Sequence, residues 1–114
     1  MRIILLTKTP QSERTRLCLR LLAGLAGSVD AMVYLAGDGV YNLLGQDEPD
    51  CTSQTANQLG KTLSALVPGD KIMACQEDLL ARGVSADGKA TVPANFYEKL
   101  VDDMMTEGNR VYTF

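Results

Sequence analysis

Residues 70–84 decide the fold and read Asp-Lys-Ile-Met-Ala-Cys-Gln-Glu-Asp-Leu-Leu-Ala-Arg-Gly-Val. The apolar run at 72–75 passes directly into a helical run at 77–82, and Gly83 is suited to end that helix. This pattern predicts a buried strand followed by a helix, with Cys75 at the junction. Parallel α/β folds place reactive groups at the carboxyl ends of strands, and the free N–H groups of a helix start favour an anion. Cys75 is therefore the first candidate for a reactive sulfur.

The rest of the chain repeats this alternation of strands and helices. Short apolar runs predict further strands at 2–7, 29–36, 91–92 and 111–114. Helical patterns begin at Thr9-Pro10 and continue at about 53–66 and 96–105. Strands that alternate with helices indicate a parallel sheet covered by helices on both faces. We expect one α/β domain over residues 1–114, with four or five strands in a flavodoxin-like order.

Composition restricts the chemistry that the chain can perform. The net charge of −3 gives no general attraction to nucleic acid or to an anionic membrane. The sequence has no histidine, which excludes serine or cysteine hydrolase chemistry with a histidine base inside one chain. Three scattered cysteines without histidine also make zinc improbable. We expect no cofactor, no metal, no direct nucleic-acid partner and no membrane association.

The start of the sequence and the cysteine count predict a compartment. Residues 1–6 are too short an apolar run for a signal peptide or a membrane span. An odd number of cysteines without an export signal is typical of reduced thiols. A cytoplasmic location is therefore expected.

Charge is distributed unevenly along the chain. Residues 1–27 contain one acid, Glu13, against five basic residues, which are Arg2, Lys8, Arg14, Arg16 and Arg20. Residues 28–60 contain no basic residue and five acids, which are Asp30, Asp38, Asp47, Glu48 and Asp50. A basic and an acidic surface could face each other across subunits, although two solvated faces are the simpler interpretation.

Each cysteine also has a purely structural interpretation. Cysteine is among the most buried residue types, so Cys75 could be an inert core residue. Cys18 falls among Leu17, Leu21 and Leu22 at helical spacing, which favours a core role, although nearby arginines could stabilise its thiolate. Cys51 lies in a polar stretch and is expected to be exposed and incidental.

A small-ligand site is a second possibility. The turn at 7–12 (Thr-Lys-Thr-Pro-Gln-Ser) follows the first strand, where flavodoxin-like folds hold phosphate. It lacks the glycines that allow close approach of a backbone to phosphate. The segment Gly37-Asp38-Gly39 is interpreted as a turn in preference to a phosphate-binding loop.

Several stretches resemble a known family. Residues 75–84 resemble the strand-to-helix segment of the DsrE/DsrF/DsrH-like sulfur-relay proteins, which include TusB, TusC and TusD. The Glu-Asp-Leu-x-Ala-Arg-Gly part is most similar to the DsrH/TusB branch. Residues 8–19 and 37–45 are similar to that branch, and the ending Val-Tyr-Thr-Phe at 111–114 is similar to its short aromatic tail. The stretch at 46–64 is longer than in that branch.

The resemblance implies a small α/β subunit that assembles with identical or related subunits, as a trimer or hexamer. In DsrE/TusD-like members, the cysteine matching Cys75 carries persulfide sulfur between donor and acceptor proteins. In some DsrH-like members a cysteine matching Cys18 is the candidate. Both residues are therefore candidate catalytic residues of a sulfur relay, of the sulfur-oxidation or tRNA 2-thiolation type. The alternatives are a non-catalytic assembly subunit and a flavodoxin-like module that binds a small ligand or nucleotide.

Overall fold

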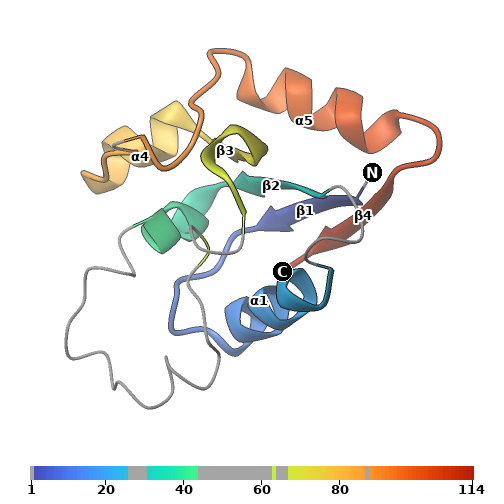
Figure 1. Ribbon diagram of the computed structural model, residues 1–114. Coiled ribbons are helices and arrows are strands. Elements are labelled where there is room, and N and C mark those ends of the chain that lie inside the picture. Colours follow the sequence, from blue (N-terminus) through green and yellow to red (C-terminus); the bar gives the residue numbers. More distant parts are fainter. Residues whose placement is uncertain (1, 26–30, 44–62, 64–66, 87) are drawn as a thin grey trace.

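Figure 1 shows the computed structural model, which describes residues 2–25, 31–43, 63, 67–86 and 88–114. The described strands are β1 (Arg2–Leu6), β2 (Ala31–Leu35), β3 (Ile72–Ala74) and β4 (Arg110–Thr113). The helices are α1 (Glu13–Leu25), α4 (Gln76–Arg82) and α5 (Phe96–Met105), with 3₁₀ helices η1 (Gly37–Leu43) and η3 (Gly69–Lys71). The expected loop around Cys51 and almost all of the expected helix at 53–66 lie outside the described residues.

The four strands form one parallel sheet in the order β3-β2-β1-β4, which confirms the predicted α/β class. A flavodoxin-like order would place β1 between β2 and β3, whereas here β2 lies between β1 and β3. The second edge of β1 is taken by β4, whose Tyr112 accepts a hydrogen bond from Arg2 Nη1 at 2.9 Å. The expected strand at 91–92 is reduced to a single bridge between Thr91 and Met73.

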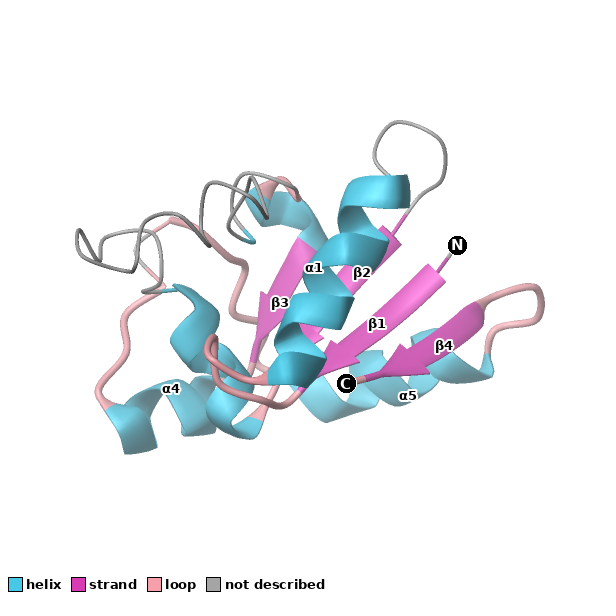
Figure 2. Ribbon diagram, turned by 90° about the horizontal axis from the view of Figure 1, so that it is seen from below, coloured by secondary structure: helices cyan, strands magenta, loops and turns pink. Residues whose placement is uncertain are grey.

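Alternate residues of the strands point to opposite faces of the sheet, and both faces are apolar, as expected for a parallel sheet covered on both sides. One face packs against α1, and its buried strand residues are Ile4, Leu6, Val33, Leu35, Ile72 and Ala74. The other face packs against α5, and its buried residues are Ile3, Met32, Tyr34, Ala36, Met73 and Cys75. Figure 2 shows α1 in front of the sheet and α5 behind it.

Helix α1 differs from its sequence prediction in two respects. It begins at Glu13 rather than at Pro10, because residues 9–12 form a turn in which Thr9 O accepts the Ser12 N–H. Ser12 Oγ then accepts the Arg14 N–H at 3.2 Å, as a capping side chain does. Cys18 and Leu22 are buried as predicted, but Leu17 is 52% exposed, because it lies about 100° around the helix from Cys18.

Gly39 and Asp103 tie the helical segments to the strands. A Cβ atom on Gly39 would lie 2.0 Å from the main-chain oxygen of Leu6, so η1 packs directly against the end of β1. On the other face, the buried hydroxyl of Tyr34 in β2 donates a hydrogen bond to the carboxylate of Asp103 in α5. Among the helices of the described segments, none has the length and apolar character that crossing a bilayer requires.

Candidate functional site

Cys75 follows the last residue of β3 and is the residue immediately before α4. Its N–H donates to Leu35 O at 3.2 Å, and its carbonyl oxygen accepts the Leu79 N–H at 3.0 Å. These bonds hold its backbone between the carboxyl end of β2 and the first turn of α4. Gly83 ends α4 as predicted, and it does so in the left-handed conformation, with φ of 67°. The predicted strand–cysteine–helix junction is therefore present.

The Cys75 side chain borders a pocket of about 250 Å³ between the start of α4 and the start of α5. Its other lining residues are Gln76, Glu77, Pro93, Ala94, Asn95, Phe96, Tyr97 and Glu98. Cys75 as a whole is only 3% exposed, because α5 covers this face of the sheet. The pocket thus adjoins a cysteine that is otherwise part of the core. Figure 1 shows α4 and α5, whose first turns carry most of the lining residues.

Tyr97 lies beside the sulfur. The Sγ–H of Cys75 points to the Tyr97 hydroxyl at a sulfur–oxygen distance of 3.9 Å, while the tyrosine as a whole is 54% exposed. Desolvation raises the pKa of Tyr97, and the hydrogen bond and charge of Cys75 raise it further. The phenol therefore keeps its proton and can donate a hydrogen bond to an anionic sulfur.

The sequence pattern did not identify Tyr97 as a site residue, since it counted Phe96 and Tyr97 together on the apolar face of a helix. Successive helical residues are about 100° apart, so only one of two neighbours faces the core centrally. Phe96 does so at 4% exposure, with its ring edge-to-face against Tyr34 at 5.6 Å between centroids. The polar end of Tyr97 is the signal that could have separated the two.

The acidic residues after Cys75 have different surroundings. Glu77 and Glu98 line the pocket, and its lining includes no lysine or arginine. Asp78 instead accepts the Gly37 N–H at 2.8 Å and pairs with Arg82, four residues further on, at 3.4 Å. Arg82 Nε also bonds Asp38 Oδ1 at 3.0 Å. Asp78 therefore connects α4 to the turn after β2.

Cys18 lies on the other face of the sheet. It is 0% exposed and belongs to the core between α1 and the strands, whereas Cys75 belongs to the core beneath α5. Burial raises the pKa of the Cys18 thiol to about 12, so the thiol stays neutral at physiological pH. Both cysteines are free thiols, and the sheet separates them. Cys51 lies outside the described residues.

Several donors of the two turns considered for phosphate already bond other groups of the chain. The N–H and hydroxyl of Thr7 both donate to Phe114 O at 3.0 Å. The N–H of Gly37 donates to Asp78, and the N–H of Gly39 donates to Ala36 O at 2.9 Å. The described segments also hold no group of three His, Cys, Asp or Glu side chains that could bind a metal ion.

These features define a parallel α/β domain with a cysteine at the carboxyl edge of its sheet, beside a pocket. No protein-family model matches the sequence, and no curated protein matches it either. Functional interpretation therefore depends on the fold and on the chemistry of the site.

Proposed function

We propose that this protein is a sulfur carrier that holds persulfide sulfur on Cys75 and passes it between a donor and an acceptor protein. The supporting observation is that Cys75 borders a pocket of about 250 Å³ at the carboxyl edge of a parallel sheet. That edge is where α/β folds place their ligands and reactive groups. The proposed setting is the cytoplasm, where thiols remain reduced, in an assembly with identical or related subunits.

The transfer is an exchange between sulfur atoms without net oxidation. The Cys75 thiolate attacks the outer sulfur of the donor's persulfide, and a new S–S bond forms on Cys75. The donor's own S–S bond breaks, and its electron pair stays on the donor cysteine, which leaves as a thiolate. The transferred outer sulfur keeps its proton, so Cys75 carries an S–SH group after the step. An acceptor thiolate later attacks the same outer sulfur, and Cys75 then leaves as the thiolate.

Tyr97 has a supporting role in this proposal. Its hydroxyl lies 3.9 Å from the Cys75 sulfur, close enough for a small movement to bring a donated hydrogen bond to the thiolate or persulfide. Its partial exposure supports a role for its hydroxyl at the surface that a partner would approach. Cys18, which is fully buried, is assigned to packing rather than to transfer.

Sulfur loading tests the proposal directly. The reduced protein is incubated with inorganic polysulfide or with a cysteine desulfurase and cysteine, and peptides containing each cysteine are examined by mass spectrometry. We expect one added sulfur atom on the Cys75 peptide, lost after treatment with a reducing thiol and absent from Cys75→Ser. Cys18→Ala is the matched control and should load normally.

Three results would count against the proposal. Sulfur on Cys18 alone would mean that the buried thiol is the acceptor. Absence of added sulfur from every cysteine would favour an assembly subunit whose thiols only pack. A yellow preparation with flavin absorbance would instead favour the ligand-binding alternative.

A further inference from the structure

The outer face of α5 has an exposed apolar stripe. Tyr97, Val101 and Met105 are spaced four residues apart and are 54%, 55% and 80% exposed. This spacing aligns side chains along one side of a helix. These three residues are each more than half exposed, whereas the opposite side of α5 buries Phe96 and Leu100. Exposed apolar stripes of this kind mark surfaces that bind another protein.

An acidic stripe lies next to the apolar one. Glu98 and Asp102 are four residues apart, are exposed, and follow Tyr97 and Val101 directly in sequence. The only cation of α5, Lys99, lies on the other side of the helix, where its Nζ is 3.9 Å from Asp103 Oδ2. The outer face of α5 is thus apolar and negatively charged, and it favours an occupant that is basic and partly apolar.

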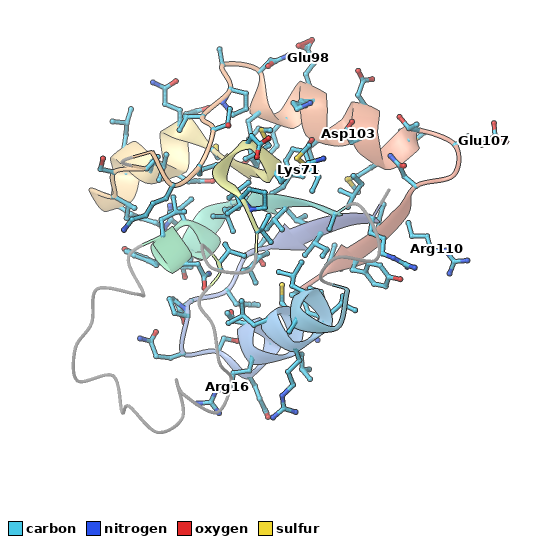
Figure 3. The ribbon with its side chains drawn as sticks, viewed as in Figure 1. Arg16, Lys71, Glu98, Asp103, Glu107 and Arg110 are labelled. Carbon is cyan, nitrogen blue, oxygen red and sulfur yellow. The ribbon has the colours of Figure 1, made fainter. Side chains whose placement is uncertain are left out.

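The same chain has such a surface on α1. Arg16 and Arg20 are exposed and four residues apart, and Leu17 between them is 52% exposed. Neither arginine forms an ion pair within the described residues. Figure 3 shows Arg16 and Glu98 pointing away from the sheet on opposite sides of the molecule, so one molecule cannot pair them itself.

We propose that the outer face of α5 binds the outer face of α1 of a second copy of this chain, which brings an arginine of that copy to the mouth of the Cys75 pocket. The occupant is inferred from charge: α5 presents Glu98 and Asp102, and α1 presents Arg16 and Arg20. Arginine stems can cover apolar surface, and a guanidinium can stack on the ring of Tyr97. Leu17 then packs against the apolar stripe of the other copy.

The contact joins two different surfaces, so each copy can bind one neighbour through α5 and another through α1. Such a head-to-tail contact gives closed rings when the rotation between copies closes, and open chains when it does not. The two helices span about 15 Å and 20 Å, which makes this a small interface. We therefore expect reversible association that depends on salt.

The consequence for the sulfur depends on the proposed function of Cys75. Glu98 lines the pocket that Cys75 borders, and no basic residue lines it. An arginine paired with Glu98 would stand at the pocket mouth and offset the negative charge that a persulfide anion meets there. The neighbouring copy would thus supply the cation that this site lacks.

Charge reversal tests the interface with the full chain. Wild type, Arg16→Glu/Arg20→Glu and Glu98→Lys/Asp102→Lys are compared by sedimentation equilibrium at low and high salt. We expect wild type to associate at low salt, and each variant alone to be monomeric. A mixture of the two variants should associate again, because both contacts then join opposite charges. Asp70→Lys, a reversal at an exposed site on η3, is the matched control and should behave as wild type.

Each outcome decides the proposal. A monomeric wild type overturns it and leaves the α5 face to a different protein. An oligomer that persists in both variants also overturns it, since another surface then holds the copies together. The proposal is also overturned if the mixture fails to associate although circular dichroism shows that both variants are folded. Sulfur loading of Cys75 is measured separately, so failure of the interface and failure of the carrier function are distinguishable.

Discussion

Replacement of Gly39 by alanine tests how closely η1 approaches β1. The new Cβ would lie 2.0 Å from Leu6 O and 2.8 Å from Leu6 C. The first distance is about 1.5 Å inside the optimal separation of nonbonded atoms. Leu6 O and Leu6 C are backbone atoms of β1, which pairs with β2 on one side and β4 on the other. Neither atom can therefore move aside as a flexible side chain does.

The expected cost follows from two contributions. Overpacking of a rigid site costs about 1–3 kcal/mol. Displacement of Leu6 O also weakens its hydrogen bond with the Ala36 N–H, now 3.2 Å long, at a cost of about 1 kcal/mol. Gly39→Ala should therefore lower the free energy of unfolding by about 2–4 kcal/mol, a large part of the roughly 5–15 kcal/mol of a typical domain.

Urea unfolding followed by circular dichroism measures this change. The slope of the unfolding free energy against urea concentration should be the same in the variant and in wild type. Two glycines with open space around the added Cβ are the controls. Gly37 has φ of 55°, so Gly37→Ala should cost only about 1 kcal/mol of strain. Gly24 lies in α1, so Gly24→Ala should stabilise by up to about 1 kcal/mol. A Gly39→Ala protein within about 0.5 kcal/mol of wild type would refute the close approach of η1 to β1.

Two further predictions concern Cys18 and Asp78. Below pH 9.0 the Cys18 thiol is protonated in the folded and in the unfolded protein. Above pH 9.0 the unfolded chain loses this proton, whereas the folded protein keeps it up to a pH of about 12. The free energy of unfolding should thus fall with rising pH across that window, by up to about 1.4 kcal/mol per pH unit, and fall less steeply in Cys18→Ala; equal slopes in urea titrations would contradict it. Asp78→Asn should destabilise by about 1–2 kcal/mol through its bonds to Gly37 and Arg82, whereas exposed Glu77→Gln should change stability little. Equal urea midpoints for these two variants would argue against Asp78 as the residue that connects α4 to the turn after β2.

Much of the site's local structure followed from sequence patterns. The apolar run at 72–75, the helical run after it and Gly83 predicted the junction at Cys75, because strand and helix periods and a left-handed glycine are properties of a few neighbouring residues. The burial of Cys18 followed in the same way from its leucine neighbours at helical spacing. The Asp78–Arg82 pair also follows from spacing alone.

Only the tertiary structure placed these parts relative to one another. Tyr97 reaches Cys75 across 22 residues of sequence because α5 packs over the face of the sheet that ends in Cys75. The strand order put β4 rather than β3 beside β1. Helix α1, which contains Cys18, packs on one face of the sheet, whereas Cys75 belongs to the core beneath α5 on the other face. Local patterns specify which residues form an element and which side of it is apolar. Which elements meet depends on packing between segments distant in sequence, and that packing alone brought a phenol and a pocket to the Cys75 thiol.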